Sequence, residues 1–142
     1  MTFTVRAFYK PGEPPVIVRS AEEMDGLVDA LLLEPFDNSI AALYVQERPL
    51  NEAGLPDHEL RVGVNAKEGT GGLRYIGGDA DATSYSKGVE SVNDEVYYCY
   101  MGNDSDFPRD SVISIEDVKR AARDFLERGG LRPHINEWQP KA

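Results

Sequence analysis

Residues 40–77 read IAALYVQERPLNEAGLPDHELRVGVNAKEGTGGLRYIG, and three runs in this stretch are typical of β-strands. The runs are Ile40–Gln46, Glu59–Asn65 and Leu73–Gly77. The segments between them are rich in Pro, Gly, Asn and Asp, which favour short turns. Because consecutive strands joined by short turns usually pair side by side, we predict an antiparallel meander.

The chain on either side of this stretch predicts further strands. Thr2–Tyr9 largely alternates apolar and polar side chains, and Val16–Val18 follows the turn-forming segment 10–15, which together predict a hairpin. Residues 78–93 hold few bulky apolar side chains and are expected to form a long surface loop. Glu95–Met101 (EVYYCYM) is dense in β-forming residues, so we predict a central strand there.

Two segments have the apolar period of helices. Residues 21–33 follow Ser20, which has capping-box spacing to a glutamate three residues on, and residues 115–128 follow Ser114, a second capping residue. Pro35 comes two residues after the first segment and Gly129-Gly130 directly after the second, as expected at helix ends. The expected buried stripes are Met24, Leu27, Val28, Leu31 and Leu32 in the first helix, and Ile115, Val118, Ala122, Phe125 and Leu126 in the second.

The C-terminal segment Leu131–Pro140 carries the only tryptophan, Trp138. An indole of this size usually buries much of its surface, so we expect Trp138 to anchor the segment on the core. The whole pattern predicts the α+β class, with an antiparallel β-sheet of about five to seven strands and two α-helices packed on it. The length of 142 residues fits one domain, which we expect to span residues 1–142.

The net charge of the chain restricts the kinds of molecule that it can bind. A net charge of −10 opposes direct binding to nucleic acid or to an anionic membrane, because both are polyanions. The N-terminus lacks the pattern of an export signal, and no apolar run approaches the roughly 20 residues of a membrane helix. Cys99 is the only cysteine and cannot form an intrachain disulfide, which favours a reducing compartment. We therefore expect a cytoplasmic protein.

The negative charge is concentrated in one part of the chain. Residues 79–117 contain ten acids against two bases, a balance of −8, whereas residues 118–142 contain three acids against six bases, a balance of +3. One interpretation is a solvated acidic face of no special role. The other is an acidic surface that attracts a basic protein partner.

The residues that most often carry catalysis form no complete site. His58 and His134 have no sequence neighbours at nucleophile–base or metal-ligand spacing. Cys99 lies between two tyrosines in a predicted strand, where a thiol is usually a buried, unreactive small hydrophobe. We predict no catalytic residue.

Three short motifs imitate ligand sites but depart from them. Residues 68–72 are rich in glycine, yet a strand follows instead of the lysine and helix of a phosphate loop, so we predict a turn. Residues 79–90 imitate a calcium loop, but Ser84 replaces its glycine and Lys87 stands at a ligand position. The acidic tripeptide 104–106 is interpreted as a turn. We expect no metal and no cofactor.

Several segments in this order resemble a known family. They are Pro56–Leu60, Val62–Val64, Gly72–Gly77, Ser86–Gly88, Asp94–Tyr98, Phe107-Pro108 with Ser111, Ala122–Phe125, Gly130–Pro133 and Glu137-Trp138. The chain resembles, over roughly residues 25–140, a family of immunity proteins from bacterial polymorphic toxin systems that is commonly encoded beside nucleic-acid deaminase toxins. The resemblance implies a non-catalytic protein that binds and neutralises a toxin. We expect it to be a monomer or small homo-oligomer.

Residues 79–110, the acidic segment, are the expected toxin-facing surface, because a nucleic-acid enzyme has a basic substrate groove. Two other interpretations stay open: a small enzyme or ligand-binding module with a tyrosine-lined pocket, and a nucleic-acid mimic that acts on a host protein. The residues predicted to contact the toxin are Asp79, Asp81, Tyr85, Asp94, Asp104, Asp106, Phe107 and Asp110.

Overall fold

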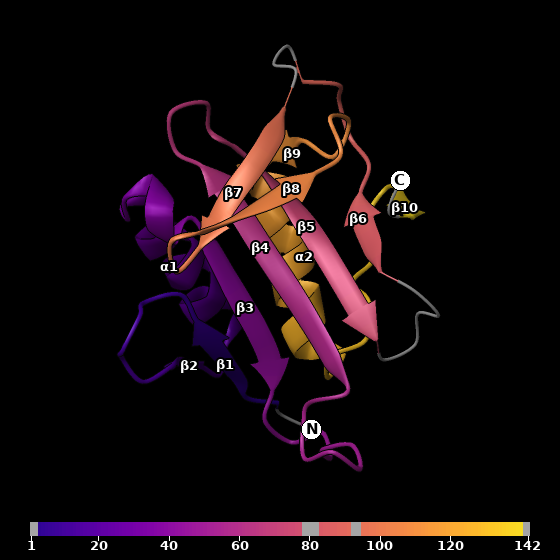
Figure 1. The fold of residues 1–142 in the computed structure, drawn as a ribbon. Helices are drawn as coiled ribbons and strands as arrows, with labels where there is room; N and C mark the ends of the chain where they lie inside the picture. Colours follow the sequence, from indigo (N-terminus) through magenta and orange to yellow (C-terminus); the bar gives the residue numbers. More distant parts are fainter. Residues whose placement is uncertain (1–2, 78–82, 92–94, 141–142) are drawn as a thin grey trace.

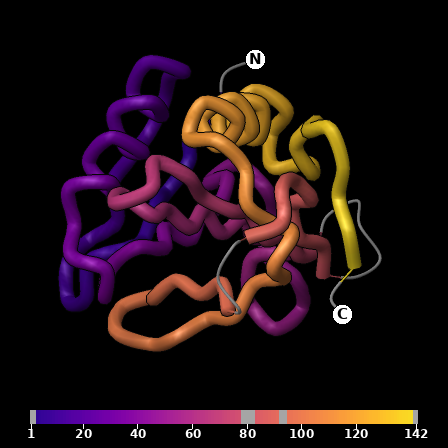
Figure 2. The backbone as a smooth tube through the Cα atoms, turned by 90° about the horizontal axis from the view of Figure 1, so that it is seen from above, coloured from indigo at the N-terminus to yellow at the C-terminus, as the bar shows by residue number. Residues whose placement is uncertain are grey.

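A large β-sheet separates two α-helices from a two-stranded hairpin in the computed structural model, which describes residues 3–77, 83–91 and 95–140. Figure 1 shows the hairpin in front of the sheet and α2 behind it. Seen from above, the helices and the hairpin lie on opposite sides of the sheet (Figure 2). This is the predicted α+β class, with one layer more than the sequence suggested.

The sheet has the strand order β10-β6-β5-β4-β3-β1-β2, and β9 pairs with β5 beside this path. Neighbouring strands are antiparallel; β3, β4 and β5 form the predicted meander, and β6 adds a strand that was not predicted. The N-terminal hairpin is also confirmed. The strands are β1 (Val5–Phe8), β2 (Val16–Val18), β3 (Ile40–Val45), β4 (His58–Asn65), β5 (Thr70–Gly77), β6 (Ser84–Ser86), β9 (Ile113–Ser114) and β10 (Trp138–Pro140).

Both predicted helices are present, as α1 (Ala21–Leu32) and α2 (Ile115–Glu127). The hydroxyl of Ser20 accepts the amide N–H of Glu23, and the hydroxyl of Ser114 accepts that of Asp117, each at 3.1 Å. These caps satisfy amides that have no partner inside the helix. A short 3-10 helix, η1 (Phe36–Asn38), follows α1.

The main core lies between the helices and one face of the sheet. Strand residues alternate between the two faces, so every second side chain of β3, β4 and β5 faces the helices. The predicted stripes of both helices belong to this core, with Leu32 and Ile115 only partly buried. Fully buried side chains from the sheet and helices include Val5, Met24, Leu31, Leu43, Leu60, Val62, Leu73, Tyr75 and Phe125.

The predictions for the hairpin were wrong in two respects. Residues 95–101 are not a central strand of the sheet: β7 (Val96–Tyr100) pairs only with β8 (Asn103–Phe107). The acidic tripeptide 104–106 is not a turn but lies within β8. The turn is at Met101-Gly102, where both residues have positive φ (50° and 86°). This conformation reverses the direction of the chain within two residues. Pairing with β7 overrides the low strand propensity of aspartate.

The prediction of an unbroken loop over 78–93 was also wrong, because β6 lies inside it. The hydroxyl of Ser86 accepts the N–H of Leu73 at 3.0 Å and donates to the carbonyl of Ser111 at 2.7 Å. Serine side chains that satisfy buried backbone groups give no apolar strand pattern. Trp138 does anchor the C-terminal segment: β10 pairs with β6, and the indole packs edge-on against Tyr75.

Candidate functional site

Two glycines allow the hairpin to lie close to the sheet. A Cβ on Gly63 of β4 would come within 2.6 Å of the Tyr98 ring, and one on Gly72 of β5 within 3.1 Å of the Phe107 ring. Contacts this short leave no room for any side chain at Gly63. The glycines of β4 and β5 therefore form the seat on which the hairpin rests.

A cluster of buried aromatic rings fixes the hairpin on this seat. The Phe107 ring lies edge-on to Tyr98 at 4.8 Å and to Tyr85 at 5.1 Å between centroids. Such edge-to-face pairs add to the stabilisation from burial alone. Tyr85 and Phe107 are only 3% and 5% exposed. The prediction of these two rings as surface aromatics is therefore wrong; they hold the hairpin in place.

The outer face of the hairpin carries the acids that the sequence singled out. Asp104 lies opposite Cys99 and Asp106 opposite Tyr97 in the β7–β8 register, and both carboxylates are exposed. They point outward because Phe107, at the next position of β8, points inward.

Asp110 differs from these two acids. It lies after β8 and is only half-exposed, and its carboxylate accepts a hydrogen bond from the side-chain amide of Gln139 at 2.9 Å. Its backbone carbonyl accepts the N–H of Gly88 at 2.7 Å. Asp110 thus fastens β10 to the sheet. The other predicted acids, Asp79, Asp81 and Asp94, lie outside the described residues.

An exposed aromatic pair borders the acids and was missed in the sequence. The rings of Phe36 in η1 and Tyr97 in β7 lie edge-to-face at 5.4 Å, and each residue is 42% exposed. Strand alternation could have identified Tyr97, because its side chain must point away from the buried Tyr98. Nothing in the local pattern indicates that η1 would meet β7.

Further contacts hold the turn end of the hairpin. The Cys99 amide donates to the hydroxyl of Ser39 at 2.9 Å, and the Gly102 amide donates to the carbonyl of Asp37 at 2.8 Å. The Arg61 guanidinium lies over the Tyr100 ring at 4.6 Å, the geometry of a cation–π contact. The outer face is therefore presented on a fixed frame.

Cys99 is the inert thiol that the sequence predicts. It is 4% exposed, and its Sγ donates to the Asp104 carboxylate at 3.2 Å. Burial, together with the negative charge of Asp104, raises the pKa of the Cys99 thiol to about 11. At neutral pH the group is a neutral thiol and a poor nucleophile.

His58 has a structural role. Its Nε2 accepts the Val45 amide N–H at 2.7 Å, so the ring proton resides on Nδ1, which faces the Asp57 carboxylate at 2.9 Å. Burial holds the pKa of His58 below its ordinary value, although Asp57 opposes this. His134 is exposed at the surface.

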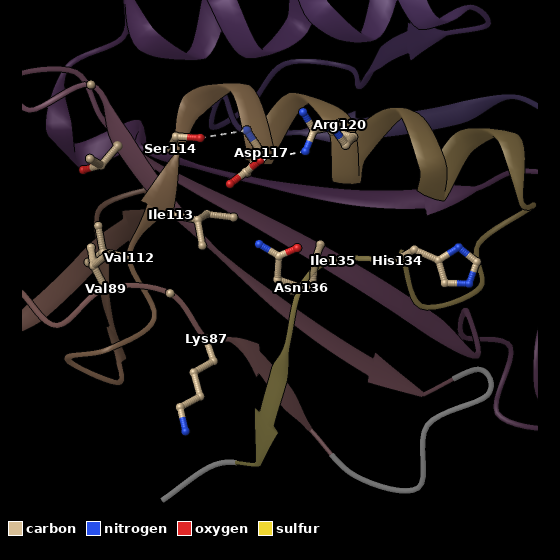
Figure 3. A pocket seen from close by; sticks show the side chains of 13 residues that line it. Lys87, Val89, Val112, Ile113, Ser114, Asp117, Arg120, His134, Ile135 and Asn136 are labelled. Atoms are coloured by element: carbon tan, nitrogen blue, oxygen red, sulfur yellow. Dashed lines mark hydrogen bonds and ion pairs between the residues drawn. The ribbon is translucent and has the colours of Figure 1, made fainter.

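A hollow with a volume of about 680 Å³ lies on another part of the surface, between the start of α2 and the segments 87–89 and 134–136. Figure 3 shows Ile113 and Ile135 between the first turns of α2 and Lys87. Asp117 accepts a hydrogen bond from Arg120 there. The described residues lining this hollow include no tyrosine, whereas a smaller hollow of about 250 Å³ is lined by Tyr97 and Tyr98 of β7.

The described residues offer neither a metal site nor a membrane-spanning helix. They contain no group of three or more His, Cys, Asp or Glu side chains arranged to hold a metal ion. Neither helix in this part of the chain is long and apolar enough to cross a membrane.

The comparison with protein families decides the relationship. The family described as immunity protein Imm1 matches residues 12–140. The chain belongs to the Imm1 family. Imm1 proteins are non-enzymatic toxin inhibitors, so this immunity protein has a cognate toxin as its partner and is not an enzyme. A comparison with curated proteins found no match.

Proposed function

We propose that this immunity protein acts in the cytoplasm and neutralises a nucleic-acid deaminase toxin by covering its active site with the outer face of the β7–β8 hairpin. The observation that carries the proposal is the pairing of exposed acids, Asp104 and Asp106, with the exposed rings of Tyr97 and Phe36 on one fixed frame. Anchoring aromatics within a charged rim are typical of protein interfaces.

The charge of this face suits such a toxin. An enzyme that acts on DNA or RNA binds phosphates in a basic groove. Exposed carboxylates on the inhibitor attract that groove and speed association, and their effect weakens as salt is added. Asp79, Asp81 and Asp94 belong to the same acidic segment of the sequence and lie outside the described residues.

The rigidity of the hairpin also supports this role. Binding by a surface already held in place loses less conformational entropy than binding by a loop that must first become ordered. The Gly63 and Gly72 seat, the buried rings and the backbone bonds to η1 provide that order. Tyr85 and Phe107 contribute by holding β8, which carries the exposed acids, on the sheet, and Asp110 contributes by fastening β10.

The test uses the toxin domain encoded by the neighbouring gene. Purified toxin is assayed for deamination of single-stranded DNA and RNA oligonucleotides with increasing amounts of the immunity protein. We expect inhibition that is complete at an equimolar ratio. A toxin that cleaves the oligonucleotides without deaminating them contradicts the deaminase assignment.

Charge reversal tests the site itself. Asp104→Lys combined with Asp106→Lys should slow association and weaken binding, because the attraction becomes repulsion. The matched control is Glu13→Lys with Glu22→Lys, two exposed acids elsewhere on the surface. Asp25 is not a suitable control, because its carboxylate accepts a hydrogen bond from Arg123 at 2.6 Å. If the control weakens binding and the hairpin pair does not, the proposed surface is wrong.

A further inference from the structure

The loop between β3 and β4 presents two leucines to solvent. We call residues 49–56 the leucine loop. Leu50 is 57% exposed and Leu55 is 59% exposed. Single exposed leucines are common. Two on one short loop form an apolar surface, and covering that surface with a partner lowers the free energy of the complex.

Hydrogen bonds within the leucine loop fix its conformation. The side-chain oxygen of Asn51 accepts the amides of Ala53 at 2.9 Å and Leu55 at 3.0 Å. The Asn51 amide donates to the carbonyl of Leu55 at 2.7 Å, and Leu50 pairs with Pro56 in an isolated bridge. These bonds hold both leucines at the ends of one closed turn.

The base of the loop is fastened to the core. The Arg48 guanidinium donates to both carboxylate oxygens of Asp57, at 3.0 and 2.9 Å, and also to the carbonyl of Gly129 at 3.4 Å. Asp57 in turn faces the buried His58 ring. A bidentate pair of this kind fixes the geometry of both partners.

The leucine loop projects to the same side of the sheet as the hairpin. In Figure 2 both lie on the side opposite the two helices. In Figure 1 the hairpin crosses one end of β4 and the loop extends from its other end. A single partner seated on this side can therefore touch both elements.

We propose that the leucine loop is the apolar anchor of the toxin interface, which inserts Leu50 and Leu55 into a concave apolar pocket with a basic rim. This inference rests on the proposed function and names a second element of the same interface. The loop is convex, so it needs a concave partner. Glu52, exposed between the leucines, suits a basic rim. The substrate pocket of an enzyme that holds a nucleobase has both features, because it packs apolar side chains on the base and binds phosphate with cations.

A second copy of this chain fits the loop less well. A stable interface buries about 800 Å² on each partner, which two partly exposed leucines cannot supply. Glu52 would also meet its own copy across the symmetry axis, and like charges there oppose association.

The experiment measures binding of the neighbouring gene's toxin domain to immobilised immunity protein. The variant Leu50→Ser with Leu55→Ser should dissociate about tenfold faster or more, because truncated anchors act mainly on dissociation. Its melting temperature should match the wild type, since neither side chain is buried. Leu33→Ser is the matched control, because Leu33 is 87% exposed at the end of α1, on the helix side. Asn51→Ala keeps both leucines but removes the bonds that position them, and should weaken binding by a smaller factor.

The outcomes separate this inference from the proposed function. If the leucine variant binds like the wild type while Asp104→Lys with Asp106→Lys binds weakly, the leucine loop is not part of the interface, and the hairpin remains the toxin-binding surface. If the leucine variant alone binds weakly, the anchor stands and the hairpin surface is wrong. Sedimentation of the immunity protein without toxin should show no dimer that depends on the leucines; such a dimer would assign the loop to a second copy and overturn the inference.

Discussion

Gly63 of β4 lies directly under the ring of Tyr98 of β7, at a distance where an added methyl group would meet Cδ2 of the ring at 2.6 Å. Gly63→Ala should therefore push the hairpin away from the sheet and lower the free energy of unfolding by about 1–3 kcal/mol, the usual range for overpacking. Urea denaturation measures this. Gly26→Ala is the control, because a Cβ there meets nothing within 4 Å, and alanine is the better helix former. Equal stability of Gly63→Ala and the wild type would show that the hairpin is not seated as described.

The exposed aromatic pair should contribute to toxin binding more than to folding. Phe36→Ser or Tyr97→Thr should raise the dissociation rate of the toxin complex, with a loss of about 1–3 kcal/mol for an aromatic anchor of moderate burial. Surface plasmon resonance gives the rates. Val16→Thr replaces a residue of similar exposure, 38%, on the edge strand β2 and should leave binding unchanged. Unchanged dissociation of both aromatic variants would remove the pair from the interface.

His58 should make the stability depend on pH in the mildly acidic range. Its folded-state pKa lies below the ordinary value of 6.5, so the unfolded chain binds the proton more readily. Stability is therefore full above pH 6.5 and falls as the pH drops from there toward the folded-state pKa, by about 1.4 kcal/mol for each pH unit between the two values. Urea denaturation at pH 7.5 and 5.5 measures this difference. His58→Gln, which can still accept the Val45 amide, should lower stability at both pH values and flatten the dependence; the same slope in this variant would assign the dependence to another group.

The sequence predicted the elements whose burial follows a simple period. The strands of the meander and both helices bury every second side chain or one helical stripe, and these patterns are visible locally. β6 was missed because its serines make hydrogen bonds rather than fill the core: Ser86 satisfies two buried backbone groups, and Ser84 accepts from the Arg132 side chain. The hairpin was misplaced because EVYYCYM is dense in β-forming residues, which imitates a central strand, whereas in the structure Tyr98 and Cys99 are buried and Tyr97 is exposed.

The candidate site was predictable in charge but not in shape. Asp104 and Asp106 were found from the local excess of acids. The neighbouring Phe36 lies 61 positions before Tyr97 in the chain, and only the docking of η1 on β7 brings the two rings together. Tyr85 and Phe107 were misjudged because an aromatic residue among acids can point to either face of a strand, and sequence alone does not show what covers each face.

Trp138 should stabilise the fold without contributing to toxin binding. The indole is half-buried against Tyr75, its Nε1 donates to the carbonyl of Pro133 at 2.9 Å, and the Arg132 guanidinium lies 5.5 Å from its ring. Because part of the ring stays exposed, Trp138→Ala should cost about 1–3 kcal/mol of unfolding free energy, less than the roughly 3–5 kcal/mol of a fully buried tryptophan. Trp138→Phe should restore most of this loss, since it lacks only the hydrogen bond and part of the ring. β10 is an edge strand and Trp138 packs on the helix side, away from the hairpin, so both variants should bind toxin at the wild-type rate when assayed below their melting temperatures. Loss of binding in Trp138→Ala with an unchanged melting temperature would instead place the indole in the toxin interface.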